Sequence, residues 1–357
     1  MKLPCITMLA TLLLTVPAAA QLQITPPDAT PSAPAEKQKP KPHTITKKKE
    51  AAPAPKPSAS PKPTSSPKPA TVIPAPSTDN SNVDLVFGAY QRGQYKTAFD
   101  LATARAQAGD PKAMTMLGEL YSNAMGMRRD YAKAAEWYKR AADAGDREAM
   151  FALSMLRISG RGGPIDKSEA VKLMASAAKL GEPRAAYNLA LLYLDGQTLP
   201  QDVKRSAELL RQAADAGLPE AQYALATFYK EGTGVPKDPE RSVRLLQAAS
   251  LADNVDAEVE YAIAMFNGTG TPKNQPAAVA LLRKASRQGS AIAQNRLAWV
   301  LINGVGTSVD KVEGFKWHLV AKTAGKGDPE LDKQLSDLPA EDRTKAEAAA
   351  KKWLGTK

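Results

Sequence analysis

A unit of 36 residues recurs along most of the chain. Its clearest mark is a small residue that returns once per unit, at Ala113, Ala149, Ala185, Ala221, Ala257 and Ala293. Four residues later each unit carries a large apolar side chain, which is Leu in all units except the one with Tyr261. A fixed period of this size is typical of stacked supersecondary units that contact only their neighbours. The period therefore constrains the fold more than any single motif does.

Each unit reads as two helices separated by a turn. Glycines in mid-unit permit the positive φ angles of a tight turn, and they occupy two registers. The first register holds Gly160, Gly196, Gly232, Gly268 and Gly304, and the second holds Gly126, Gly162, Gly234, Gly270 and Gly306. An Asx residue follows, suited to cap the second helix: Asp130, Asp166, Asp202, Asp238, Asn274 and Asp310. A last glycine register predicts left-handed helix ends at Gly145, Gly181, Gly217, Gly289 and Gly325.

An aromatic pair, Trp137 and Tyr138, stands in the second helix of the first unit. Four of the six units have Leu at the Trp137 position, so we interpret it as a core packing position. The Tyr138 position holds Met, Leu or His318 in the other units, and we expect its side chains to be half-buried.

The pattern A-x-x-x-L-G-x-x-Y-x-x-G-x-G-V-x-x-D-x-x-K-A-x-x-W-x-x-x-A-A-x-x-G resembles the Sel1-like repeat family, a relative of tetratricopeptide repeats. The resemblance extends from about Val83 to Lys326, and its clearest matches include "AQYALATFYKEGTGVPKDPERSVRLLQAAS". It implies an all-α fold, an α-solenoid superhelix of stacked helix-turn-helix repeats. We expect a tetratricopeptide-like capping unit over 81–112, six repeats over 113–328, and capping helices over 329–357 that include Trp353.

The first 80 residues have a different composition. Residues 1–20 read as a secretory signal peptide, with a short apolar run and an Ala-x-Ala exit that places cleavage after Ala20. Residues 21–80 are rich in Pro, Lys and Ala, with nine lysines and three acidic residues between 26 and 78, and we predict a disordered linker. The mature chain is then expected to be periplasmic or secreted, without a transmembrane segment. An uncleaved anchor is the alternative.

The resemblance also indicates where a partner would bind. In the family, the first helix of each unit lines the concave face of the solenoid. Its exposed positions here are largely apolar or aromatic, which is typical of an interaction surface. The candidate protein-binding residues are Phe151, Met155, Tyr187, Leu191, Leu194, Tyr223, Lys230, Ile263, Phe266, Trp299 and Ile302. The alternative is that the superhelix buries part of this set against itself.

The sequence offers few residues from which a catalytic or metal-binding site could be built. The chain has two histidines, His43 and His318, and one cysteine, Cys5, which lies within the predicted signal peptide. Zinc ligation and nucleophilic sites that need His or Cys are therefore not expected, and we predict no cofactor and no metal. Ser176 and Lys179 match S-x-x-K, the acylating motif of penicillin-recognising enzymes, but its companion motifs are missing.

These features predict a non-enzymatic exported scaffold or adaptor that binds a protein segment in the concave groove, in envelope assembly or signalling. The alternative is binding to peptidoglycan or another anionic envelope surface through the basic linker, with the repeats as a spacer. A β-lactam-interacting enzyme is a remote third possibility. The net charge of +11 lies largely in the linker, and nucleic acid is not an expected partner of an exported chain.

Overall fold

In the computed structural model, residues 85–355 are described. They belong to the second of two compact units of the chain, Val83–Lys357. Within this range the chain forms sixteen helices and no strands, as the sequence predicts. The predicted signal peptide and linker lie outside the described residues.

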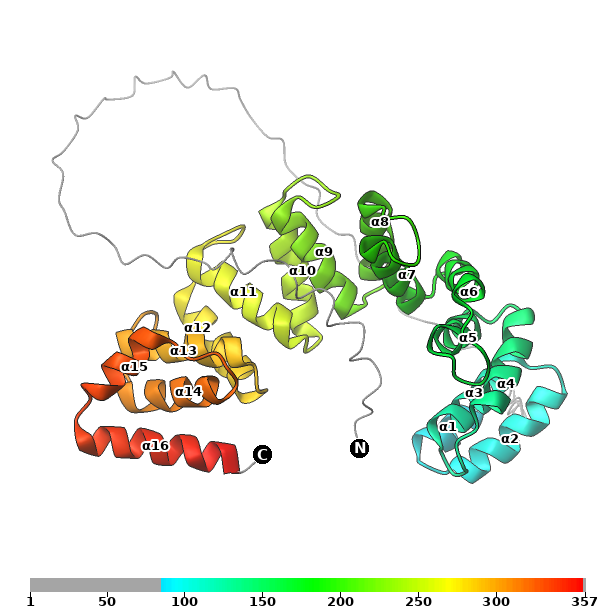
Figure 1. Cartoon of the computed structure of the whole chain (residues 1–357), viewed down its shortest axis with the longest axis horizontal. Helices are drawn as coiled ribbons and strands as arrows, with labels where there is room; N and C mark the ends of the chain where they lie inside the picture. Colours follow the sequence, from blue (N-terminus) through cyan, green and yellow to red (C-terminus); the bar gives the residue numbers. More distant parts are fainter. Residues whose placement is uncertain (1–84, 356–357) are drawn as a thin grey trace, which may run out of the picture. The chain divides into compact units, whose positions relative to one another are not determined.

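Twelve consecutive helices of 13 residues each make up six helix pairs (Figure 1). The pairs are α3 (Pro111–Asn123) with α4 (Tyr131–Asp143), α5 (Arg147–Ser159) with α6 (Lys167–Lys179), α7 (Pro183–Asp195) with α8 (Val203–Asp215), α9 (Pro219–Glu231) with α10 (Pro239–Leu251), α11 (Val255–Asn267) with α12 (Gln275–Arg287), and α13 (Ala291–Asn303) with α14 (Lys311–Thr323). The two helices of each pair pack on each other, and the second helix also packs on the first helix of the next pair. The units are thus stacked in chain order.

The predicted helix ends are confirmed. The side chain of each Asx residue accepts a backbone N–H of the second helix, at 3.0 Å for Asp130 and at 2.8 Å for Asp166. The second helices end at glycines with positive φ, such as Gly145 at 90°. Two helix ends lack the expected glycine and still adopt the left-handed conformation, at Ala124 (φ 56°) after the first helix α3 and at Asp253 (φ 58°) after the second helix α10. The backbone geometry of the unit is therefore imposed by its packing and not by glycine alone.

The loop glycines of the second register bring neighbouring units into close contact. A Cβ on Gly162 would lie 2.1 Å from the carbonyl oxygen of Tyr131, the first residue of the preceding second helix. We call this contact of a loop with the preceding second helix the loop junction. It recurs at Gly126, Gly234, Gly270 and Gly306, where an added Cβ would come within 2.3–2.8 Å of the residue 31 positions earlier. Thr198 takes this position before α8 and has no positive φ.

The Tyr138 position is buried more deeply than predicted, whereas the Trp137 position is a packing position as predicted, buried at Leu209 and Trp317. All six side chains at the Tyr138 position are buried, including Tyr138 and His318, whereas Trp137 is half-buried against a cluster of α1, α2 and α3. The reason is the fit between the two helices of a pair. A Cβ on Gly118 would lie 2.5 Å from the Tyr138 ring. The missing side chain of Gly118 therefore makes room for the large Tyr138 ring between the two helices.

Additional helices close both ends of the stack. Before the repeats, α1 (Leu85–Gln91) and α2 (Tyr95–Gln107) are joined by only three residues. After them, α15 (Pro329–Ser336) and α16 (Ala340–Gly355) follow, and α16 packs on α14. Trp353 of α16 meets Trp317 edge to face, with ring centroids 5.0 Å apart. Trp353 thus covers the last apolar face, as expected. Among residues 85–355, no helix combines the length and apolarity needed to span a membrane.

One acidic side chain is fully enclosed in the stack. Glu258 of α11 has a side-chain exposure of 0% and forms an ion pair through Oε1 with Lys284 of α12. Lys284 also pairs with Asp253 at 2.8 Å. The neighbouring units have Gln222 and Gln294 at the Glu258 position, so a neutral amide fits the same place. A buried carboxylate depends on its cation, because desolvation disfavours the charged form.

Two glycine substitutions separate backbone strain from a steric clash. Gly145→Ala introduces a Cβ into open space at a positive φ, so we expect it to lower the free energy of unfolding by about 1 kcal/mol. Gly162→Ala adds the clash with the Tyr131 carbonyl, and we expect a loss of roughly 3 kcal/mol. Urea unfolding followed by far-ultraviolet circular dichroism measures both. Equal losses would show that the loop junction contributes nothing of its own.

A second pair of variants tests the enclosed carboxylate. Lys284→Met leaves Glu258 buried without its cation and is expected to lower the free energy of unfolding by about 2 kcal/mol. Glu258→Gln/Lys284→Met removes the charge as well and is expected to regain most of that loss. The measurement is the same urea titration. A double variant no more stable than Lys284→Met would contradict the dependence of Glu258 on Lys284.

Candidate functional site

The predicted binding residues all lie on the first helices of their units. They come from α5, α7, α9, α11 and α13, and ten of them keep part of their surface open. We call these ten the first-helix stripe: Phe151, Met155, Tyr187, Leu191, Leu194, Tyr223, Lys230, Ile263, Phe266 and Trp299. Lys230 is exposed, and the other nine are half-buried.

Ile302 does not belong to this surface. Its exposed fraction is 6%, and it packs against α14, where a Cβ on Gly314 would lie 2.6 Å from its Cγ1. The expectation that Ile302 is available to a partner is therefore corrected. Gly314 gives the physical reason, because its missing side chain lets α14 approach α13 at this point.

The half-burial of the stripe comes from contact with the core. Phe151, Met155, Tyr187 and Leu194 pack on one buried cluster that extends from α6 to α9. Ile263, Phe266 and Trp299 pack on a second cluster that extends from α11 to α16, and Tyr223 packs on a third between α9 and α11. Each of these side chains therefore has one face in the core and another open.

A charged residue of the next unit lies near each aromatic side chain that the stripe has on α5, α7 and α9. The guanidinium carbon of Arg184 lies 5.1 Å from the centroid of the Phe151 ring. Burial and Glu220 raise the pKa of Tyr187. Burial also raises the pKa of Tyr223, with further contributions from Glu260, Asp256 and Glu231. The stripe therefore presents apolar rings bordered by a cation at one point and by carboxylates at others.

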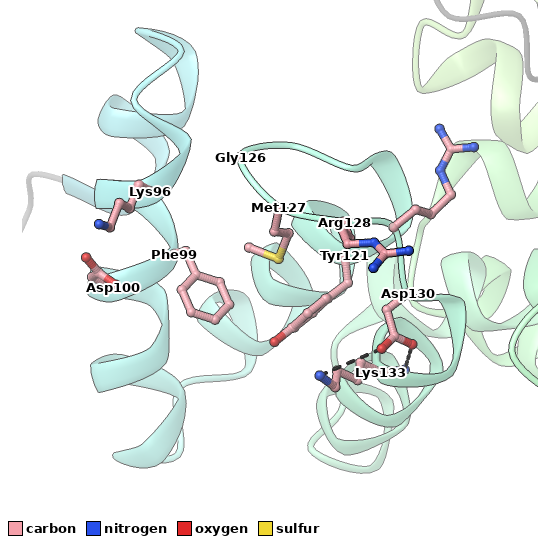
Figure 2. Close-up of a pocket in the computed structure, with 10 residues that line it drawn as sticks. Lys96, Phe99, Asp100, Tyr121, Gly126, Met127, Arg128, Asp130 and Lys133 are labelled. Carbon is pink, nitrogen blue, oxygen red and sulfur yellow. Dashed lines mark hydrogen bonds and ion pairs between the residues drawn. The ribbon is translucent and has the colours of Figure 1, made fainter.

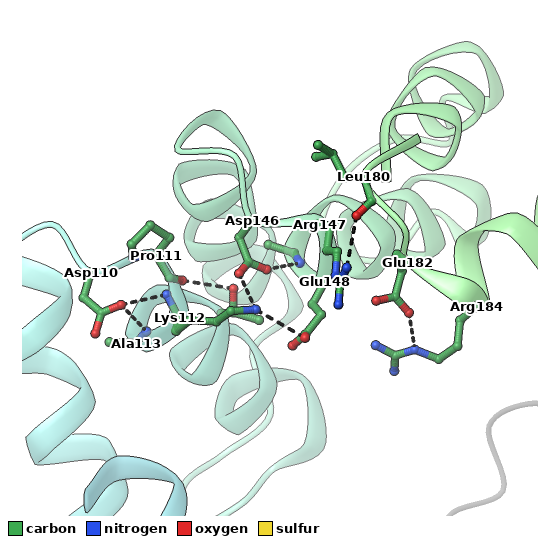
Figure 3. A network of polar contacts seen from close by, with 12 residues as sticks. Asp110, Pro111, Lys112, Ala113, Asp146, Arg147, Glu148, Leu180, Glu182 and Arg184 are labelled. Carbon is green, nitrogen blue, oxygen red and sulfur yellow. Dashed lines mark hydrogen bonds and ion pairs between the residues drawn. The ribbon is translucent and has the colours of Figure 1, made fainter. Parts of the chain in front are cut away.

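Polar contacts join the starts of successive first helices (Figure 3). Lys112 of α3 lies between Asp146 and Glu148, at 2.8 Å and 3.2 Å from their carboxylate oxygens. Arg147 of α5 donates to the Leu180 carbonyl at 3.0 Å. Farther along, Lys230 of α9 pairs with Glu260 of α11 at 2.7 Å. These contacts connect neighbouring units, and the last of them involves Lys230 of the stripe.

Glu119 of α3 continues the stripe toward the N-terminal end. Burial raises the pKa of this carboxyl, and the nearby Glu148 adds to the effect, whereas Arg184 opposes it. The spacing of the repeat aligns Glu119 with Met155 and Trp299, so the sequence placed it on the same face. The sequence did not reveal that carboxylates and cations of the next two units influence the pKa of Glu119.

His318 has a structural position. It is fully buried and not half-buried as predicted, and its Nε2 lies 2.8 Å from Oδ1 of Asp332. Asp332 also pairs with Lys322 at 2.7 Å, and the contacts from Lys322 and His318 lower the pKa of its carboxyl. Because Asp332 belongs to α15, this contact fastens α15 to α14.

The remaining chemical motifs form no assembled site. Ser176 and Lys179 are both exposed on α6, and no hydrogen bond joins their side chains. Within residues 85–355, no group of three His, Asp or Glu side chains lies close enough to hold a metal ion. The first-helix stripe is thus the most extended candidate surface.

Comparison with known families agrees with this architecture. The model of the Sel1 repeat matches six consecutive segments: residues 111–146, 147–182, 183–218, 219–254, 255–290 and 291–326. The chain belongs to the Sel1 repeat family. The matches begin two residues before the frame predicted from the sequence, and they have the same length of 36 residues. Sel1 repeat solenoids are a scaffold fold for protein–protein interaction, and the family is generally non-catalytic.

Solved structures of Sel1 repeat proteins have the same fold. A protective antigen of uropathogenic Escherichia coli with this fold is 26% identical, with a TM-score of 0.64 over 72% of this chain and 56% of that one. This chain thus spans little more than half the length of the antigen. A Sel1 repeat protein from Oxalobacter formigenes is also 26% identical, with a TM-score of 0.60 over 67% of this chain and 98% of that one. No curated protein matches the chain.

The tyrosines of the Sel1 repeats yield a test of the stripe's electrostatics. Because the pKa of Tyr223 is raised in the folded state, its stabilising contribution is complete below about pH 10 and declines as the pH rises further. Tyr223→Phe removes this decline, so its urea midpoint is expected to fall less than that of the wild type between about pH 8 and about pH 10.5.

Tyr229→Phe is the matched control. Although burial alone would raise the pKa of Tyr229, hydrogen bonds from Arg241 and Arg211 lower it, so the sign is opposite. This variant is expected to lose more stability than the wild type over the same pH range. If both variants followed the wild type, neither burial nor the neighbouring carboxylates would shift the pKa of Tyr223.

Proposed function

We propose that this protein is an exported, non-enzymatic scaffold whose first-helix stripe binds a segment of a partner protein in the cell envelope, in its assembly or in signalling. The observation that supports this proposal most directly is the half-burial of the stripe. Eight apolar or aromatic side chains are anchored in the core on one face and open on the other. Rings held in this way lose little side-chain entropy on binding, which favours them as anchors for a partner.

The charges around the stripe limit the partner's chemistry. Carboxylates surround Tyr223, and Glu220 lies near Tyr187. A segment with apolar side chains and lysine or arginine between them would place its cations against these groups. Export is supported by the composition of residues 1–20, and a protein partner by the scaffold fold of the Sel1 repeat family.

The alternative is that the lysine-rich residues 21–80 bind peptidoglycan or another anionic envelope polymer. The nine lysines between residues 26 and 78 favour this function, because clustered cations attract anionic surfaces. In that case the repeats serve as a spacer. The two functions require different parts of the chain, so one crosslinking experiment can distinguish them.

Site-specific photocrosslinking in cells tests the proposal. A photoreactive residue at Trp299, and in a second strain at Tyr223, is expected to capture one discrete protein. The same residue at Lys204, which is exposed on the second helix α8, is expected to capture none. Adducts at Lys204 equal to those at Trp299, or a capture confined to a probe within residues 21–80, would contradict the stripe as the working surface.

The captured protein is then titrated against the purified chain. Trp299→Ala is expected to weaken binding by about thirtyfold, the effect of losing an aromatic anchor, while the melting temperature shows whether the fold is kept. Lys204→Ala serves as the control and is expected to leave the affinity unchanged. Unchanged affinity for Trp299→Ala and Tyr223→Ala alike would exclude the stripe from the interface.

A further inference from the structure

An open cavity lies at the first loop junction, away from the first-helix stripe (Figure 2). It has a volume of about 810 Å³, within the range typical of ligand sites. Three elements form its walls: helix α2, the end of α3 with the loop that follows, and the start of α4. The lining residues that matter most are Lys96, Phe99, Tyr121, Met127, Arg128 and Arg129.

One part of the cavity is apolar. The rings of Phe99 and Tyr121 meet edge to face, with centroids 5.8 Å apart, and Figure 2 shows Met127 beside them. Methionine adapts its shape to a neighbouring apolar group, and aromatic edges and faces provide large contact area. This wall is suited to an apolar side chain.

The other part of the cavity is cationic. Lys96, Arg128, Arg129 and Lys133 contribute four positive charges, against two carboxylates from Asp100 and Asp130. Asp130 is occupied, since it caps α4 and lies 3.7 Å from Lys133. The Arg128 side chain forms no ion pair or hydrogen bond with any described residue, and Arg129 contacts the Tyr131 ring only. Two guanidinium groups are therefore available to an anion.

Comparison with the later units shows that this junction differs from the others. The Arg128 position holds Pro164, Pro200, Pro236 and Pro272 in the next four units. The Phe99 position holds Ala or Val in the next five second helices, and the last one, α14, has the buried Phe315 there. At the α8–α10 junction the hydroxyl of Tyr229, the counterpart of Tyr121, accepts hydrogen bonds from Arg211 at 3.3 Å and Arg241 at 3.4 Å. There the cations are used within the protein.

We propose that this cavity binds an acidic peptide segment in which a carboxylate side chain lies next to an apolar one. A guanidinium group matches a carboxylate through two parallel hydrogen bonds, and the Phe99–Tyr121–Met127 wall receives the neighbouring apolar side chain. An inorganic anion would leave that wall unused. The inference rests on the proposed scaffold function, because it takes a protein segment as the ligand, but it assigns that segment to a second surface.

Fluorescence anisotropy with the full-length protein tests this site. The probe is a fluorescein-labelled peptide of alternating glutamate, leucine and phenylalanine residues. Arg128→Gln/Arg129→Gln is expected to weaken its binding at least about tenfold, the effect of losing charged hydrogen bonds. Lys237→Gln/Lys273→Gln is the matched control. These lysines occupy the Arg129 position in two later loops, so the control removes the same charge and is expected to change the affinity less than about twofold.

Further probes separate a built site from general attraction to positive charge. Phe99→Ala is expected to weaken the same peptide, and a peptide of glutamate and glycine is expected to bind at least about tenfold more weakly than the apolar one. Equal weakening by the two double variants, or equal binding of the glutamate–glycine peptide, would overturn the proposal. Arg128→Pro, which introduces the residue found in four of the five later loops, guards against misfolding, because it must weaken binding with an unchanged circular dichroism spectrum.

Failure here is distinct from failure of the stripe. The Arg128→Gln/Arg129→Gln variant keeps Trp299 and Tyr223, so crosslinking at those positions reports on the stripe independently. Loss of peptide binding with stripe capture intact would support a second site. If a partner were captured at the stripe but the peptide did not bind the wild type, the scaffold function would be supported and the peptide site in the cavity would be refuted.

Discussion

The stack of helices depends on a close approach of backbones at the loop junctions. At Gly162 the loop of one unit lies so near the Tyr131 carbonyl of the preceding second helix that no side chain fits between them. The contact recurs at five junctions, each time with the residue 31 positions earlier. It fixes the start of each second helix against the next unit, and the Ala-rich faces of the helix pairs can then pack closely. Where Thr198 replaces glycine, Leu199 of the same loop packs on the core instead.

Much of this architecture could be predicted from the sequence because local chemistry determined it. The Asx caps, the left-handed glycines and the alanine period each specify backbone geometry within a few residues. Burial was predicted less well, because it depends on which side chains face each other across helices. Counting Leu at the Trp137 position suggested a core residue, but Gly118 opposite Tyr138 decides which of the two aromatic residues goes inside. In the same way, the missing side chain of Gly314 lets Ile302 be buried between α13 and α14.

The candidate surfaces show the same division. The period placed the first-helix stripe on one face, since residues at equal positions in each unit must align. It gave no sign of the charges that neighbouring units bring to Tyr187 and Tyr223, because such contacts cross unit boundaries. The cavity at the first junction has a sequence signal that only comparison between units reveals, namely Arg128 where four of the five later loops have proline.

Contacts that cross unit boundaries have an evolutionary consequence. Phe151 and Arg184 are separated by 33 residues, and the two halves of their contact belong to successive units. A duplicated unit of 36 residues carries one residue that contacts the unit before it and another that contacts the unit after it. The stack can therefore lengthen by one unit without a mismatch at the new boundary. An insertion of another length within a helix would shift one half relative to the other. Natural variation in this family should therefore proceed by whole units, and the recognition surface should lengthen in steps of one repeat.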